Sequence, residues 1–232
     1  MITPLASVLV NRLTGSRTII TRKMQTPPSL TYEQKLKLDD LAERLIASEE
    51  PVTILIDGHE AEISEYLIKK LPNARVVMDG GSLRASNIKL AAWTDYFVVS
   101  EHFARDYMSY RSLSTEAEIK AALIELNKIC RGEAFITLGE KGCAFLKSGM
   151  LQIVPSWLCN AVDTTGAGDV FHGAFTYGVH YSWHIDNIIL FASLTAAISI
   201  EKKGVRESMP DLAVVHHSLN SYERNLKQYF EE

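Results

Sequence analysis

The segment from Asp163 to Asp169, which reads DTTGAGD, holds residue types that can bind an anion and accept a proton. An apolar run follows it and predicts a helix that begins at about Asp169. The first amides of a helix are unpaired and carry partial positive charge. Gly166 and Gly168 lack a Cβ and Ala167 adds little bulk, so an anion can approach the backbone closely. The segment therefore predicts an anion hole suited to a phosphoryl group in transfer.

Asp169 stands beside the predicted anion hole and could act as a general base toward an attacking hydroxyl. The alternative is structural, because an Asp at the start of a helix is often only an N-cap. Here a second Asp and both glycines occur in the same short segment, which favours the chemical interpretation.

The elements around this segment alternate between strand and helix. Capping-box sequences at 31–34 and 115–118 begin two helices, and a third begins at the glycine segment. Strands are predicted at 52–56, 75–78, 96–99 and 134–138. This alternation indicates an α/β fold with a mainly parallel sheet and helices on both faces. Ligands of such sheets bind beyond the carboxyl ends of the strands, where the polar residues Asp57, Asp79, Ser100 and Gly139 occur.

Two hairpins flank the alternating pattern. One joins 5–10 to 17–21 near the start of the chain, and the other joins 143–146 to 151–154. Helices are also predicted at 188–200 and, on the apolar residues from Val214 to Tyr229, at the end of the chain.

The composition narrows the class of protein. The 232 residues are 47% hydrophobic and 22% charged, with a formal net charge of −4. We expect no nucleic-acid partner and no membrane partner, because both need a clustered basic surface or a long apolar run. Three cysteines without paired spacing argue against structural zinc or a disulfide framework. The sequence predicts a cytoplasmic protein.

The glycine segment, extended as DTTGAGDVFHGAF, resembles the C-terminal signature of the ribokinase-like (PfkB) carbohydrate kinases. Residues 136–142 (ITLGEKG) resemble the nucleotide segment of that family. Residues 191–193 and 204–210 resemble its adenine-side helix and the loop that follows. Residues 76–84 and 98–105 are similar to the ketohexokinase-like branch. The resemblance covers nearly the whole chain and implies a ribokinase-like fold.

The resemblance also implies roles for individual residues. Asp169 would be the general base, and the amides of Gly166, Ala167 and Gly168 would form the anion hole. Four residues would line the nucleotide site: Thr137, Gly139, Gly142 and Ser193. Members often hold a monovalent cation, usually K⁺, and its ligands here would be Asp163, Thr165, Ser199, Lys202, Gly204 and Ser208. The alternative for 199–208 is an ordinary helix C-terminus with a glycine cap.

The chain departs from the family pattern in two places. Many members carry an N-x-x-E motif that organises Mg²⁺, and the matching stretch here is 100–103 (SEHF), so water and ATP phosphates would supply the Mg²⁺ ligands. The sequence also shows no counterpart of the family's first strand or of its sugar-gripping G-G-x-x-x-N segment. We therefore expect residues 1–24 to be part of a lid hairpin and 25–232 to be the nucleotide-binding α/β domain. A shortened form, a partner-dependent form and a degenerate kinase are all compatible with this.

The activity implied is transfer of the ATP γ-phosphoryl group, with Mg²⁺, to a hydroxyl of a sugar or sugar-like substrate. One alternative is a catalytically impaired nucleotide-binding or interaction protein, and another is a nucleoside or vitamin alcohol as acceptor. Arg84 could contact an anionic part of the substrate or be a solvated surface arginine. His172, one turn after Asp169, is predicted to be a polar surface residue. The family's lid often mediates dimers, so the resemblance is compatible with a homodimer and leaves the oligomeric state open.

Overall fold

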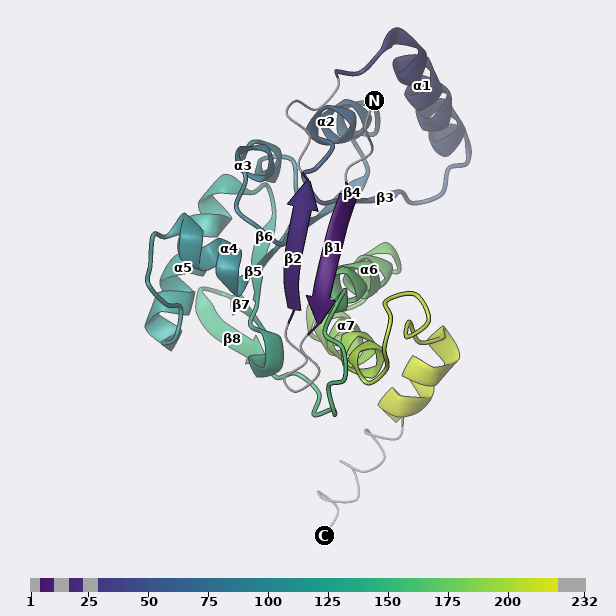
Figure 1. Cartoon of the computed structure of the whole chain (residues 1–232). Helices are drawn as coiled ribbons and strands as arrows, with labels where there is room; N and C mark the ends of the chain where they lie inside the picture. The colour runs from purple at the N-terminus through teal and green to yellow at the C-terminus, as the bar shows by residue number, and fades with distance from the viewer. Residues whose placement is uncertain (1–4, 11–16, 23–28, 221–232) are drawn as a thin grey trace.

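The computed structural model describes residues 5–10, 17–22 and 29–220 of the chain. Strands β3 (Thr53–Ile56), β4 (Arg75–Gly80), β5 (Tyr96–Ser100) and β6 (Glu133–Thr137) pair in parallel in that order. The hairpin of β7 (Cys143–Lys147) and β8 (Met150–Val154) continues the sheet antiparallel from β6. The predicted α/β class is confirmed, with a mixed edge on a mainly parallel six-stranded sheet (Figure 1).

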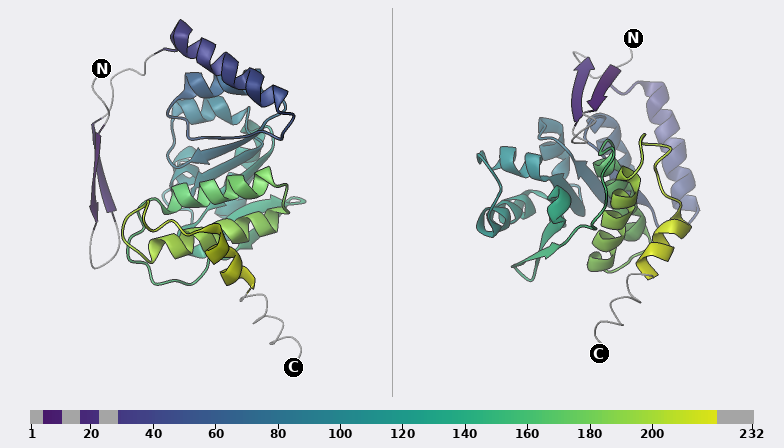
Figure 2. Two further views of the ribbon diagram at one scale, coloured as in Figure 1. Left: turned by 90° about the vertical axis from the view of Figure 1, so that its right-hand side faces the viewer. Right: turned by 60° about the horizontal axis from the view of Figure 1, so that its bottom comes forward.

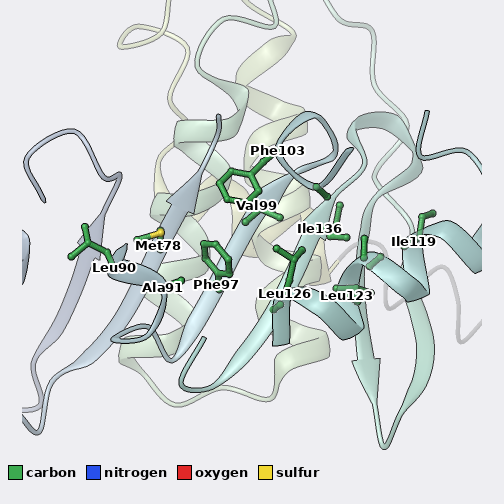
Figure 3. Packing of buried hydrophobic residues seen from close by; sticks show 14 of the residues in the cluster. Met78, Leu90, Ala91, Phe97, Val99, Phe103, Ile119, Leu123, Leu126 and Ile136 are labelled. Atoms are coloured by element: carbon green, nitrogen blue, oxygen red, sulfur yellow. The ribbon is translucent and has the colours of Figure 1, made fainter. Parts of the chain in front are cut away.

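Alternating side chains of the strands feed two apolar layers. Met78, Phe97 and Ile136 face helices α3 (Ala85–Ala91), α4 (Glu101–Tyr107) and α5 (Glu116–Ile129), as Figure 3 shows. Val77, Val98 and Phe135, each adjacent in sequence to one of these, face the other way, as the period-two geometry of a strand requires. They pack against α6 (Ala167–His180) and α7 (Ile185–Ile200). Helices therefore cover both faces of the sheet.

The remaining helices lie at the periphery. Helix α1 (Tyr32–Ala47) packs on α2 (Ala61–Lys70) through a small third cluster around Ala42 and Leu71. Residues 212–220 are helical, and Val215 packs into the α6–α7 layer. The predicted continuation of this terminal helix to Tyr229 lies outside the described residues.

Capping explains where helices α1 and α5 begin. The side chain of Thr31 accepts from the Gln34 amide, and the side chain of Gln34 accepts from the Thr31 amide. Thr115 and Glu118 form the same reciprocal pair at the start of α5. Both predicted capping boxes are confirmed, and each satisfies two amides that the helix leaves unpaired.

Strands β1 (Leu5–Val10) and β2 (Arg17–Arg22) form the predicted N-terminal hairpin, a separate two-stranded antiparallel sheet. The two views in Figure 2 place this hairpin beside the α/β body rather than within its layers. Within the described residues, no helix has both the length and the apolar character needed to cross a bilayer.

Candidate active site

The glycine segment forms the N-terminus of α6. Helix α6 begins at Ala167, two residues before the predicted start, and its N-cap is Gly166 in the left-handed conformation at φ 77°. Gly166 is buried, and a Cβ built there would lie 2.5 Å from Cγ1 of Val205. The segment needs glycine at this position both for its backbone angle and for the close approach of the turn after α7.

Asp169 lies in the first turn of α6 with its side chain exposed. It is not the N-cap, and the N-cap residue makes no side-chain capping bond. Asp163 is not the N-cap either, since its carboxylate accepts from the Thr165 amide at 3.0 Å within the preceding loop. The purely capping interpretation of these two carboxylates is therefore wrong. Asp169 is left as an exposed carboxylate directly after the amides of 166–168.

Three carboxylates gather at the carboxyl edge of the sheet: Asp57 just after β3, Asp79 near the end of β4, and Asp169. Burial raises the pKa of the Asp79 carboxyl above its usual value. The nearby charge of His172 lowers that pKa, and the charges of Asp169 and Asp57 raise it further. The three side chains are thus close enough to share one electrostatic environment.

His172 is buried, with 3% of its surface exposed, so the prediction of a polar surface residue is wrong. The spacing placed it correctly one turn after Asp169, but the helix turns it inward against the sheet. There its ring Nδ1 lies 3.3 Å from Oδ2 of Asp79. The burial of His172 depends on contacts with residues far away in the sequence, so the sequence around it did not reveal this burial.

The predicted nucleotide residues fall into two groups. Thr137 ends β6, Gly139 opens the short 3₁₀ turn of Gly139–Lys141, and Gly142 ends that turn at φ 101°. These three lie at the carboxyl end of β6, as predicted. A Cβ on Gly142 would lie 2.0 Å from the Val154 carbonyl oxygen. Ser193 lies apart from them in the sequence, in the middle of α7, with 6% of its surface exposed.

Hydrogen bonds join the segments that carry the predicted monovalent-cation ligands, between the loop before α6 and the end of α7 with the turn after it. The Gly204 amide donates to Oδ2 of Asp163 at 3.3 Å, and the Val162 and Asp163 amides both donate to the carbonyl of Ile200. Ser199 and Ser208 are buried, while Lys202 is exposed on the same turn. Gly204 has φ 86° but lies beyond Glu201, the C-cap of α7, so it is not a simple helix cap.

Thr165 supplies a test of the fit to a cation. Among the described residues, its Oγ1 is the one buried side-chain polar atom without a hydrogen-bond partner. A buried hydroxyl oxygen without a partner is costly unless an ion or water satisfies it. The donor set is therefore compatible with a hard monovalent cation held by oxygen atoms.

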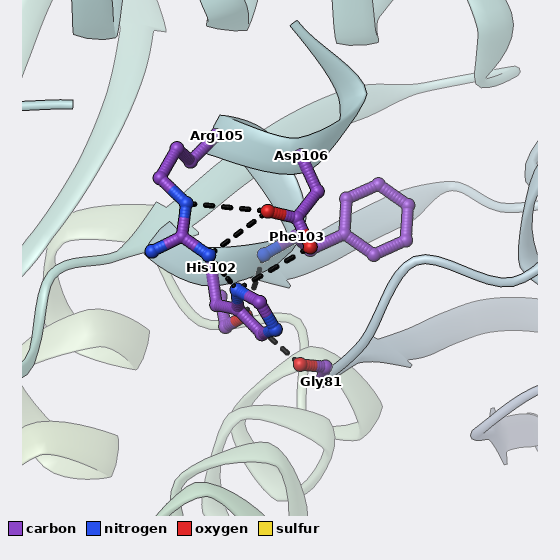
Figure 4. Close-up of polar contacts among 6 residues, drawn as sticks. Gly81, His102, Phe103, Arg105 and Asp106 are labelled. Atoms are coloured by element: carbon purple, nitrogen blue, oxygen red, sulfur yellow. Dashed lines mark hydrogen bonds and ion pairs between the residues drawn. The ribbon is translucent and has the colours of Figure 1, made fainter. Parts of the chain in front are cut away.

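The stretch 100–103 is built as a helix start. The Ser100 hydroxyl donates to the carbonyl of Gly81 at 3.0 Å and accepts from the Phe103 amide, so it caps α4 (Figure 4). Phe103 is fully buried. Of these four residues only Glu101 offers a carboxylate, and within the described residues no group of three His, Cys, Asp or Glu side chains is arranged to hold a metal ion.

Helix α4 also carries a cluster of three polar side chains, His102, Arg105 and Asp106. Arg105 bonds Asp106 at 2.9 Å and contacts the His102 ring, which lies 3.4 Å from the same carboxylate (Figure 4).

Arg84, the N-cap of α3, is only partly exposed and has no ion pair within 4.0 Å among the described residues. Within the described part of the chain, Arg84 is therefore a cationic side chain without an ion-pair partner, at the end of the loop between β4 and α3.

A hollow of about 420 Å³ lies elsewhere, against Asp95, Glu133 and Trp183. Asp95 precedes β5 and Glu133 begins β6, so this hollow is at the amino ends of the strands. The candidate site is at the opposite ends, and the hollow is not part of it.

Comparison with known proteins decides the family. Residues 81–212, more than half of the chain, match the pfkB family of carbohydrate kinases. The chain belongs to this family. The matched residues include the glycine segment and the turn after α7, two of the segments that form the candidate site.

Among its pfkB relatives, the ribokinase of Lactococcus lactis is 29% identical over 189 residues, which cover 82% of this chain and 60% of that protein. The ribokinase of Schizosaccharomyces pombe is 33% identical over 135 residues, covering 56% of this chain and 42% of that protein. The chain therefore spans about half the length of the curated relatives that it matches.

Solved structures agree on the fold. The ribokinase of Giardia lamblia superposes with a TM-score of 0.75 at 21% identity, covering 95% of this chain and 72% of that one. The Arabidopsis thaliana ribokinase complexed with ribose and ATP gives 0.70 at 21% identity, covering 91% and 67%. The predicted ribokinase-like fold is confirmed.

Proposed function

We propose that this chain carries the phosphoryl-transfer half of an ATP-dependent sugar kinase, which moves the γ-phosphoryl group of ATP to a hydroxyl of a sugar or sugar-like substrate. The observation that carries the proposal is the exposed carboxylate of Asp169 in the first turn of α6, directly after the left-handed Gly166. The names of its relatives, ribokinases and deoxyribokinases, support a sugar as acceptor.

In this proposal the acceptor hydroxyl lies against Asp169, which takes its proton as the oxygen attacks the γ-phosphorus. The amides of 166–168 face the oxygens of the migrating group, where negative charge is concentrated in the transition state. Thr137, Gly139 and Gly142 line the path of the nucleotide, with Ser193 on the adenine side. Arg84, which has no carboxylate partner within the described part of the chain, contacts the acceptor.

Two cations fit this arrangement differently. A monovalent cation such as K⁺ would be held by Asp163, Thr165 and the turn of 199–208, and would steady the loop that precedes the anion hole. Mg²⁺ would neutralise charge on the phosphates, with most of its ligands being phosphate oxygens and water. Strands β1 and β2 are assigned to a lid within residues 1–24, and residues 25–232 to the nucleotide-binding α/β domain.

The test compares the wild-type protein with Asp169→Asn and with Asp186→Asn. Asp186 is also an acid in the first turn of a helix, but it is on α7 and pairs with Lys147. We expect sugar-dependent ATP turnover to fall by about 10²- to 10⁴-fold in Asp169→Asn, the usual contribution of a general base. Asp186→Asn should retain activity, and titration calorimetry should show ADP affinity preserved in both variants.

Three other results would each contradict a different part of the proposal. A wild-type protein that binds ADP but turns over none of a panel of pentoses, hexoses and nucleosides would favour the nucleotide-binding alternative. Turnover with a nucleoside alone would keep the chemistry and change the acceptor class. Full activity in Asp169→Asn would remove the proposed base.

A further inference from the structure

His172 makes polar contacts to three different elements although its side chain is buried. Its ring Nδ1 lies 2.6 Å from the carbonyl oxygen of Gly168 and 3.3 Å from Oδ2 of Asp79. Its Nε2 lies 3.1 Å from the carbonyl oxygen of Val98. The ring therefore links the first turn of α6 to β4 and to β5.

The two backbone partners are oxygens that can only accept hydrogen bonds. Nδ1 faces the Gly168 carbonyl and Nε2 faces the Val98 carbonyl, so both ring nitrogens are placed to donate. The carboxylate of Asp79 lies beside the ring as its counter-charge, and 17% of that side chain is exposed. A buried polar group that loses its hydrogen-bond partners costs free energy, so these contacts restrict the movement of the ring.

The ring of His172 contacts the residue that directly precedes Asp169, so its restricted movement affects the candidate site. Gly168 supplies one amide of the segment that faces the phosphoryl group, and Asp169 follows it directly. The neighbours of His172 on the inner face of α6, Phe171 and Phe175, belong to the apolar layer against the sheet. His172 thus joins the turn that carries the base to β4 near its carboxyl end and to the middle of β5.

We propose that His172 is a positioning residue for phosphoryl transfer: its Nδ1–H, held by Asp79, fixes the Gly168 carbonyl and thereby the orientation of the anion-hole amides and of the Asp169 carboxylate. This inference rests on the proposed kinase function. The Nδ1 contact with Gly168 orients the reacting groups. The Nε2 contact with Val98 only anchors the ring to the sheet.

Two substitutions separate these contacts. In His172→Asn the amide nitrogen can occupy the place of Nδ1, which is bonded to Cγ, and so can still donate to Gly168. In His172→Gln the amide nitrogen reaches the place of Nε2 and can donate to Val98, while the contact with Gly168 is lost. We expect kcat to stay within about threefold of wild type in His172→Asn and to fall by about 10- to 100-fold in His172→Gln, the scale of a small misplacement of reacting groups.

The binding of nucleotide distinguishes positioning from loss of structure. The Kd for ADP should change by less than about threefold in both variants, because the effect appears in the transition state and not in ground-state binding. Phe175→Leu, one turn further along the same buried face of α6, is the control for lowered stability. Its kcat per folded molecule should equal that of wild type at a comparable drop in Tm.

The outcomes separate this inference from the proposed function. A wild-type kcat in His172→Gln, or equal losses in the Asn, Gln and Phe175→Leu variants, would overturn the inference while leaving the kinase activity in place. A nitrogen-15 spectrum of the imidazole that shows only one ring N–H would overturn the double-donor geometry. If the wild-type protein neither binds ADP nor turns over ATP, the proposed function fails first and the inference fails with it.

Discussion

The Gly204 amide donates a hydrogen bond to Oδ2 of Asp163 at 3.3 Å, across 41 positions of the chain. The other oxygen of the same carboxylate accepts from the Thr165 amide at 3.0 Å. One side chain therefore joins the loop before α6 to the turn after α7. The geometry of the glycine segment, the proposed anion hole, should depend on this junction, because Gly166 packs directly against Val205 of the same turn.

Replacing Asp163 with Ala should destabilise the fold and loosen the glycine segment. Two amides would lose a charged acceptor, and a hydrogen bond to a charged group contributes about 1.5–3 kcal/mol. We expect a loss of about 2 kcal/mol in the free energy of unfolding, measured by urea denaturation. Any dependence of ADP binding on K⁺ over Na⁺ should disappear as well. An unchanged unfolding free energy would show that the junction contributes nothing to stability.

The glycines at 166 and 168 predict opposite responses to the same substitution. In Gly166→Ala the alanine must adopt φ near 77°, and its Cβ would lie 2.5 Å from Val205 Cγ1. Either the loop before α6 or the turn after α7 must therefore move. We expect a loss of about 1–3 kcal/mol, the scale of a strained backbone position. Around Gly168 a Cβ meets no atom within 4 Å, so Gly168→Ala should fold as well as wild type.

Thermal unfolding of the two variants side by side tests this pair. If Gly168→Ala binds ADP more weakly while keeping its Tm, an anion approaches this amide closely enough to meet the methyl group. Equal Tm values for both alanine variants would contradict the steric role of Gly166.

Much of the fold could be predicted because the deciding signals are local. The strands read as short apolar runs, and the Thr31 and Thr115 capping boxes lie within four residues of sequence. Helices α3 and α4 were not predicted, because each has only seven residues and no periodic apolar pattern long enough to detect. At α4 the sequence analysis considered the stretch 100–103 only as a departure from the family's Mg²⁺ motif, and it did not predict the Ser100 cap.

The sequence predicted the part of the candidate site whose residues are neighbours in the chain. Asp169 and its glycines share one segment, so their proximity follows from the motif. The partners of His172 do not: the Val98 carbonyl is 74 positions away, and Asp79 is on another strand. Contacts of this kind arise from the packing of α6 on the sheet, which no local pattern encodes.

The three cysteines should differ in their rates of alkylation. Burial raises the pKa of the Cys130 thiol to about 11 and raises the pKa of the fully buried Cys143 thiol still more. Burial, followed by the charge of Glu201, also raises the pKa of Cys159, but less strongly than that of Cys130. Since the thiolate is the reactive form, iodoacetamide at pH 8 should label Cys159 first, Cys130 slowly, and Cys143 only on unfolding.

Peptide mass mapping at timed intervals reads out this order. The Cys159→Ser variant is the control, since it should remove the fast phase and leave the slow one. Labelling of Cys143 in the native protein at the rate of Cys159 would mean that the β7 region opens readily.

The dependence of stability on pH should carry a contribution from Asp79. Burial raises the pKa of this carboxyl above 3.8 despite the opposing charge of His172, and Asp169 and Asp57 add to the increase. A raised folded-state pKa means that the stabilisation is complete below pH 3.8 and is lost as the pH rises through the folded value. In Asp79→Asn the neutral amide does not titrate. The unfolding free energy of this variant relative to wild type should therefore increase between about pH 4 and about pH 7. Urea unfolding of both proteins across this range measures the difference, and two parallel curves would show that attraction to His172 fully offsets the cost of burying the charge.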